Sequence, residues 1–185
     1  MLIIDGKGDL GNGSIYAIVN SLKASRKVYI VDLNNPLTSD KYNPFKNTSP
    51  TVVKDMIVNL SVWSEEHYKQ KAERYIQRLV ELMNLSNIPL SLKSITNNMP
   101  VDNFTMLSAT LSKEKIITKE EHLNNVDIAK VCGSIAESAA ARFTNIVENE
   151  LGTIFDESGI DIFTALKENA IILFVLNPLL YPELS

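Results

Sequence analysis

The chain of 185 residues is 45% hydrophobic and 22% charged, which is enough apolar material for one domain or two small ones and excludes a disordered segment. Its 22 acidic and 18 basic residues are interspersed and give a formal net charge of −4, which excludes the one-signed surface of an autonomous nucleic-acid binder. A single cysteine, the lack of any apolar run near the ~20 residues of a membrane span and the lack of a signal-peptide pattern predict a cytoplasmic chain with no disulfide and no membrane span of its own.

A short apolar strand is predicted near residues 2–5, and a glycine-rich, charged turn follows it. Residues 8–14 have the frame of the phosphate-binding loop G-x-x-x-x-G-K-[ST], whose lysine reaches the outer phosphates of a nucleoside triphosphate. In this chain Gly13, and not a lysine, stands directly before Ser14. The pattern therefore indicates an α/β unit of the nucleotide-handling type that lacks the residues for hydrolysis.

An amphipathic helix is predicted from about residue 14 to residue 24. Its apolar face consists of Ile15, Ile18, Val19 and Leu22. The segment 27–32 is almost continuously apolar, which is typical of an interior strand of a parallel sheet with both faces covered. Residues 33–49 are rich in Asn, Pro and Ser, and they predict an ordered loop.

Helical periodicity dominates from Pro50 to about residue 153, so a separate helical unit is predicted. Its clearest helix follows Ser64, which is a favourable N-cap residue. The apolar side of that helix consists of Tyr68, Ala72, Tyr75, Ile76, Leu79, Val80 and Met83. Shorter helices are predicted around residues 90–97 and 101–111.

A long helix, or a broken pair of helices, is predicted to begin at Thr118. Thr118 and Glu121 have the spacing of a capping box, in which each side chain hydrogen-bonds the backbone N–H of the other residue. Gly133 lies within this segment and predicts either a break in the helix or a close contact with another helix.

After Gly152 the α/β pattern returns with a short helix at 161–168, and residues 177–185 predict a turn and the start of another helix. The predicted fold class is α/β with a large all-helical insertion and a partial parallel sheet. Its parts are strands near 2–5, 27–32 and 170–176, a partial nucleotide-binding-type domain of residues 1–49 and 154–185, and an inserted all-alpha domain of residues 50–153. Because three short strands make an incomplete open sheet, we expect the chain to be a fragment of a larger domain.

The first turn also matches a dinucleotide-binding fingerprint, which gives an alternative hypothesis. Gly6, Gly8 and Gly11 fit G-x-G-x-x-G between a strand and a helix, and Asp32 ends the next strand, where an acid would hold the ribose hydroxyls. This alternative predicts an NAD(P)-binding enzyme of the Rossmann type. The negative charge of Asp5 before the turn and the change to helices after only two strands count against it.

No catalytic residue and no metal site are predicted. His67 and His122 are far apart in the sequence and have no partner at ligand spacing, and the serines lack a nucleophile motif. The basic residues of the helix after Ser64 alternate with glutamates, which favours a solvated mixed-charge face over contacts with phosphates. Protein recognition is therefore favoured over DNA recognition.

Several runs of the sequence occur in the order seen in conjugative coupling proteins of the TraD/TraG kind, which are related to the FtsK and HerA motor ATPases. These runs are Ile4-Asp5-Gly6-Lys7-Gly8-Asp9, the strand Val28–Leu33, Tyr42-Asn43-Pro44-Phe45, Trp63-Ser64-Glu65-Glu66-His67-Tyr68, and Leu166–Leu184 with Tyr181-Pro182-Glu183. The chain resembles this family over most of its length. The resemblance is weakest between about 85 and 155, the variable all-helical domain of the family.

The resemblance implies that the intact protein is a ring-shaped homo-hexameric ATPase at the inner face of a bacterial membrane, which pumps DNA or a DNA–relaxase complex into a type IV secretion channel. The parent protein would bind ATP and Mg²⁺ outside this fragment, for which no cofactor is expected. The helical domain would recruit a relaxase or other secreted protein cargo, and DNA would bind through the assembled parent.

Asp5, Lys7 and Asp9 are the candidate binding residues that follow from this resemblance. They lie where a core strand ends, at the edge of an α/β sheet where ligands bind, and would be near the nucleotide or a subunit interface. The alternative is a glycine turn whose charges are solvated or paired with each other. A helical scaffold without any ligand remains a third hypothesis for the whole chain.

Overall fold

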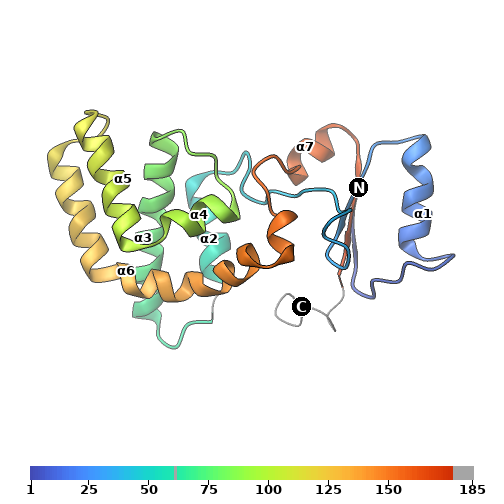
Figure 1. Cartoon of the computed structure of the whole chain (residues 1–185), viewed down its shortest axis with the longest axis horizontal. Coiled ribbons are helices and arrows are strands. Elements are labelled where there is room, and N and C mark those ends of the chain that lie inside the picture. Colours follow the sequence, from blue (N-terminus) through green and yellow to red (C-terminus); the bar gives the residue numbers. More distant parts are fainter. Residues whose placement is uncertain (61, 177–185) are drawn as a thin grey trace. The chain divides into compact units, whose positions relative to one another are not determined.

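The computed structural model of the chain describes residues 1–60 and 62–176. It shows an α/β fold with a small parallel sheet and a large helical bundle, which confirms the predicted fold class (Figure 1). The turn and helix start predicted at 177–185, including Tyr181-Pro182-Glu183, lie outside the described residues.

The chain divides into two compact units. The α/β unit comprises Met1–Asn47 and Glu148–Ser185, and the helical unit comprises Thr48–Val147. The α/β unit contains β1 (Leu2–Asp5), α1 (Ile15–Ser21), η1 (Leu22–Ala24), β2 (Val28–Asp32), η2 (Glu150–Thr153), α7 (Ile162–Lys167) and β3 (Ile171–Val175). The helical unit contains α2 (Pro50–Asn59), α3 (Glu66–Leu85), α4 (Leu92–Asn98), α5 (Val101–Lys113) and most of α6 (Lys119–Glu148).

The three strands form a parallel sheet in the order β1-β3-β2. β3 is therefore the middle strand, and its Val175 lies opposite both Asp5 of β1 and Asp32 of β2. The expectation that residues 27–32 form an interior strand is wrong for this sheet, because β2 pairs with β3 alone among the described residues. The apolar run of β2 reflects burial by the layers above and below it, not a strand on each side.

The outer edge of β2 is covered by the loop that follows it. The backbone N–H of Ile30 donates to Asp40 Oδ2 at 2.6 Å, and the N–H of Asp40 donates back to the Ile30 carbonyl at 2.9 Å. The N–H of Asp32 donates to Ser39 Oγ at 2.9 Å. These side chains occupy backbone groups that a further strand would use, so β2 has a closed edge.

One face of the sheet packs against α1, which runs along the strands in Figure 1. Val19 is the only fully buried residue of α1, and its neighbours in the core include Ile30, Leu173 and Val175. The remaining members of the predicted apolar face are substantially exposed. These are Ile15 (44%), Ile18 (57%) and Leu22 (36%). The helix thus buries only part of its apolar stripe.

On the opposite face of the sheet, the loop after β2 and α7 pack against β3. The ring of Tyr42 meets Phe174 edge-on with centroids 5.0 Å apart, and Tyr42 forms a parallel bridge with Ile160. A side chain at Gly159 would clash, because a Cβ there would lie 2.5 Å from the Tyr42 carbonyl carbon. Glycine is therefore required at the point where these two segments meet.

The N-terminus of α7 is held by a buried carboxylate. Asp161 Oδ1 accepts from the Thr164 N–H at 2.8 Å, and Oδ2 accepts from Thr164 Oγ1 and from Asn47 Nδ2 at 2.6 and 3.1 Å. Burial alone would raise the pKa of Asp161, but these hydrogen bonds outweigh it and lower that pKa below the ordinary value. A charged N-cap thus fixes α7 to the loop at residue 47.

The helical unit is organised around α3, whose buried face matches the predicted one except at Tyr68, which is 37% exposed. Tyr75 stacks on Phe104 of α5 with ring centroids 4.5 Å apart, and its hydroxyl donates to the Met99 carbonyl at 2.7 Å. The N-cap of α3 is Glu65 and not Ser64, and Glu65 makes no side-chain capping bond. The first turn of α3 therefore forms without a side-chain cap, and the buried face of the helix begins at Ala72.

The capping box predicted at the start of α6 is present. The Glu121 N–H donates to Thr118 Oγ1 at 3.1 Å, and the Thr118 N–H donates to Glu121 Oε2 at 2.7 Å. These bonds lower the pKa of Glu121. The helix then continues through Gly133 without a break, because the glycine serves a close contact: a Cβ there would lie 2.2 Å from Val101 Cγ2.

Along residues 1–60 and 62–176, every helix is too short or too polar to cross a membrane.

Candidate functional site

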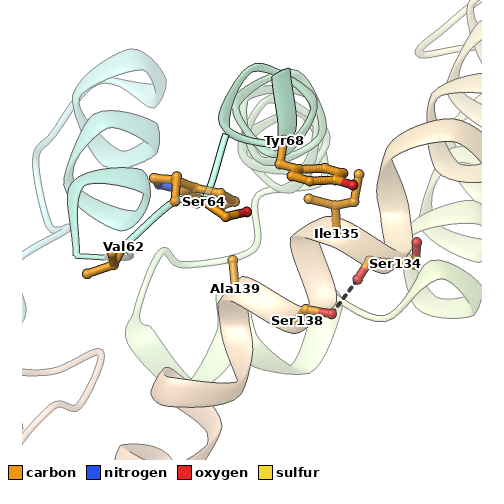
Figure 2. A pocket seen from close by; sticks show the side chains of 8 residues that line it. Val62, Ser64, Tyr68, Ser134, Ile135, Ser138 and Ala139 are labelled. Carbon is orange, nitrogen blue, oxygen red and sulfur yellow. Dashed lines mark hydrogen bonds between the residues drawn. The ribbon is translucent and has the colours of Figure 1, made fainter. Parts of the chain in front are cut away.

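The helical unit contains a groove of about 390 Å³ between the segment before α3, the first turn of α3 and the middle of α6 (Figure 2). It is lined by Val62, Trp63, Ser64, Tyr68, Ser134, Ile135, Ser138 and Ala139. All of these residues belong to the helical unit, so the groove does not depend on the α/β unit.

One wall of the groove is formed by large side chains that are fixed in place. The indole N–H of Trp63 donates to the Val58 carbonyl at 2.9 Å, which ties the segment before α3 to α2. Val62 next to it is 87% exposed, and the Tyr68 ring lies near Ile135 in Figure 2. A water-exposed valine beside an anchored indole makes this wall apolar and accessible.

The opposite wall is formed by α6, with Ile135 beside the three small residues Ser134, Ser138 and Ala139. Ser138 Oγ donates to the Ser134 carbonyl one turn earlier at 2.8 Å, as the dashed line in Figure 2 shows. The serine hydroxyl is thereby occupied within the helix, and Ala139 adds only a methyl group. Small residues leave room for an incoming apolar side chain, and this wall carries no charged group.

The rim of the groove at the start of α3 is acidic. Glu65 and Glu66 are exposed there, and Glu65 Oε2 lies 3.0 Å from Nδ1 of His67, which is half exposed. The His67 ring also packs on Tyr68, with centroids 3.9 Å apart. The arrangement suits an apolar anchor flanked by basic residues, and it offers no nucleophile paired with a base.

The candidate residues of the first turn mainly hold the turn itself. Asp5 is 7% exposed, and its Oδ1 accepts from the Lys7 N–H at 3.0 Å. Asp9 Oδ1 accepts from the Gly11 N–H at 2.8 Å. Lys7 is exposed. The two carboxylates thus stabilise the turn through its own backbone, while Lys7 extends from the carboxyl end of β1 into solvent.

The geometry around α1 differs from that of a dinucleotide fingerprint. Such a fingerprint places its glycines at the start of the helix so that a pyrophosphate meets the helix N-terminus. Here α1 begins at Ile15, four residues after Gly11, and its N-cap Ser14 already accepts from the Ala17 N–H at 3.1 Å. Asp32, which would hold a ribose, accepts instead from the Asn34 N–H and from Asn35 Nδ2, both at 2.9 Å.

A buried polar network crosses the core of the helical unit, and sequence reasoning missed it. Arg78 Nε donates to Asn125 Oδ1 at 2.7 Å, and Asn125 Nδ2 donates to Ser108 Oγ at 2.8 Å. Ser108 Oγ lies 3.0 Å from Nδ1 of His122. Ser108 and Asn125 are fully buried, so the Ser108–His122 pair is inaccessible to a substrate and serves to join α3, α5 and α6.

A signal for this network exists in the sequence. Asn125 lies three residues before Ile128 on the apolar face of α6, where a polar residue needs a buried partner. The sequence signal for the groove is weaker, because Trp63 and Tyr68 are equally compatible with burial in a hydrophobic core.

The described residues contain no group of three or more His, Cys, Asp or Glu side chains that could hold a metal ion. Cys132 is buried in the helical unit, and Tyr75, whose pKa is raised by burial, has no access to solvent. Among the described residues, the groove between α3 and α6 is the candidate site, and its lining of apolar and small side chains suits the binding of an apolar group. No protein-family model matches the chain, and no curated protein matches it.

Proposed function

We propose that the helical unit is a protein-recognition module that binds a partner through the groove between α3 and α6. The observation that carries this proposal is the pairing of an 87% exposed Val62, held beside the anchored Trp63, with a wall of small residues on α6. Exposed apolar side chains around a preformed groove are typical of binding surfaces. The partner we propose presents an apolar anchor flanked by basic residues, which complements the acidic rim at Glu65 and Glu66.

The resemblance to conjugative coupling proteins supplies the identity of the partner in this proposal. In that setting, the chain is part of a homo-hexameric ATPase at the inner face of a bacterial membrane, and the groove recruits a relaxase or other secreted protein cargo. The parent protein binds ATP and Mg²⁺ outside this chain and moves DNA through its assembled ring. The run of residues 4–9 and the insertion of a helical unit between β2 and β3 support this setting.

In this setting Lys7 is the member of the first turn that is free to approach a nucleotide or a neighbouring subunit, since Asp5 and Asp9 hold the turn.

A pull-down with the purified relaxase encoded beside the parent gene tests the proposal. The immobilised chain of 185 residues is expected to retain the relaxase. Val62→Asp, which places a charge on the apolar wall, and Ala139→Trp, which fills the groove, are each expected to lower retention at least tenfold, about 1.4 kcal/mol of binding free energy.

Met106→Asp is the matched control, because Met106 is 66% exposed on α5 and does not line the groove. It is expected to leave retention unchanged. Retention that is equal for wild type and both groove variants contradicts the groove as the site. Failure of the chain to bind a relaxase that the full-length parent does bind contradicts the recognition role itself.

The dinucleotide alternative is tested on the same chain by titration with NAD, NADP and ATP. Saturable binding of a dinucleotide at low micromolar concentration would favour the Rossmann-type enzyme over the recognition module. It would do so although the side chains of Asp32 and Ser14 already accept hydrogen bonds from their own backbone segments.

A further inference from the structure

The two edges of the sheet differ in how their backbone groups are used. The outward groups of β2 at Ile30 and Asp32 are bonded to Asp40 and Ser39, as described above. On β1, the carbonyls of Met1 and Asp5 accept from β3, at Ile172 and Leu176. Because alternate residues of a strand turn toward each neighbour, Leu2 and Ile4 turn their backbone N–H and C=O groups away from β3. Among the described residues, the free edge of the sheet is therefore at β1.

The side chains at this edge are apolar and exposed. Leu2 is 43% and Ile4 is 64% exposed, and both lie on the face of the sheet opposite α1, since Ile3 packs with the Val19 core. An open edge that also carries exposed large aliphatic side chains is a site at which another strand adds.

The exposed apolar flank of α1 lies toward the β1 edge of the sheet. Val19 and Tyr16 face the sheet, and at 100° per residue Ile15, Ile18 and Leu22 lie about a quarter-turn around the helix from them. Parallel strands are joined by right-handed connections almost without exception, and in a right-handed connection β1-α1-β2 this flank is turned toward β1 and away from β2. The free edge and the apolar flank thus form one continuous surface above and beside β1.

We propose that this surface pairs with the same surface of a second copy of the chain, through antiparallel pairing of β1 with its counterpart about a two-fold axis at Ile3. In this register Leu2 and Ile4 of one copy lie opposite Ile4 and Leu2 of the other, and their outward backbone groups form four hydrogen bonds. A register centred on Leu2 or Ile4 pairs fewer of these groups. The strand is therefore self-complementary in one register.

The same register also buries the exposed side chains. Leu2 and Ile4 of both copies form one apolar cluster on the face opposite α1. A two-fold axis perpendicular to the sheet keeps both α1 helices on one face, so their flanks of Ile15, Ile18 and Leu22 face each other above the two Ile3 side chains. An interface of one short strand pair and two helix flanks is expected at the lower end of the specific size range, about 1,200 Å² in total, so we expect a weak association.

This inference concerns the chain of 185 residues and does not rest on the proposed function. Light scattering after size exclusion at 5 to 200 µM, concentrations that bracket roughly micromolar association, tests it. Wild type is expected to pass from the monomer mass toward twice that mass. Ile4→Lys is expected to stay monomeric, whereas Phe163→Lys is expected to dimerise like wild type, because Phe163 is equally exposed (64%) on α7 of the same unit. A wild-type monomer at every concentration overturns the proposal and leaves the surface to a different occupant.

The register has its own test. Residues that face each other at the two-fold axis in a non-hydrogen-bonded pair lie about 4.5 Å apart at Cα, within disulfide range. Ile3→Cys is therefore expected to form a covalent dimer on mild oxidation, whereas Ile4→Cys, which faces Leu2, is not. The native Cys132 is buried and does not compete. Dimerisation of wild type without this difference between the two variants overturns the strand pairing.

Discussion

The helical unit and the α/β unit are stabilised in different ways. The helical unit surrounds α3 with fully buried side chains, among them Tyr75, Phe104 and Leu111, and joins its helices by a buried polar network. The α/β unit has a smaller core around Val19, depends on side chains that hold loops and helix ends, and exposes apolar residues at β1 and α1. The helical unit is thus stabilised mainly by its own large core, whereas the α/β unit combines a smaller core with capped helix ends and an exposed apolar surface at β1 and α1.

The largest expected effect tests the apolar core of the helical unit. Phe104→Ala removes a ring that is fully buried and stacked on Tyr75, and the resulting cavity is expected to cost about 4 kcal/mol of unfolding free energy. Urea denaturation followed by far-UV circular dichroism measures it. The control Phe163→Ala removes an equally large ring that is 64% exposed, and a loss as large as that of Phe104→Ala would contradict the assignment of stability to the buried core.

The next effect concerns the buried network that joins three helices. Asn125→Ala leaves Arg78 and the buried hydroxyl of Ser108 without their partner, which is expected to cost about 3 kcal/mol. The double variant with Ser108→Ala removes the second buried polar group and is expected to regain part of this loss. A loss in the double variant equal to the sum of the losses in Asn125→Ala and Ser108→Ala alone would show that the network does not act as a unit.

The α/β unit is expected to respond to acid through Asp161. Because its pKa is lowered in the folded protein, its contribution is complete above the ordinary value of 3.8 and is lost as the pH falls through the lower folded-state pKa. Asp161→Ala is expected to cost about 2 kcal/mol at pH 7 through loss of the α7 cap. Asp161→Asn keeps an acceptor for the Thr164 N–H and is expected to lose less, with a weaker dependence on pH below 4.

Hydrogen exchange at pH 7 and pH 3 measures the acid sensitivity of each unit independently. Protection in α7 and its neighbours is expected to fall at low pH before protection in α3, since Asp161, Asp156 and Glu168 of the α/β unit all have lowered pKa values. Earlier loss of protection in α3 would reverse the comparison.

The smallest expected effect tests the close approach of two helices. Gly133→Ala improves helix propensity by about 1 kcal/mol, but the new Cβ would lie 2.2 Å from Val101 Cγ2 and force α5 away from α6. A net loss of about 1 kcal/mol in thermal or urea unfolding is expected. A gain in stability would show that the contact is loose, because only propensity would then remain.

The sequence predicted the elements whose signals are local. The capping box at Thr118 and Glu121, the proline at the start of α2, and most of the buried face of α3 depend on spacing within one helix, and all are present. The parallel direction of the three strands followed from their apolar runs and the helices between them.

The parts that were missed depend on contacts between distant residues. The covered edge of β2 results from Asp40, eight residues beyond the strand, so an apolar run could not distinguish an edge strand from a middle one. The network of Asn125 and Ser108 spans α5 and α6, and the groove is lined by residues as far apart in the sequence as Val62 and Ala139. Hydrophobic periodicity identifies which side of a helix is apolar, but not whether its neighbour covers all of that side, as α1 shows.

The bonds of Asp40 and Ser39 along β2 have a consequence for the size of any assembly. A sheet that is open at both edges can add copies without end, which is the route to fibrils. Here, the outward backbone groups of β2 at Ile30 and Asp32 are already bonded within the chain, so we expect strand addition between copies to stop after a single partner has joined at β1. The loop after β2 thus limits strand pairing between copies of the chain to a dimer.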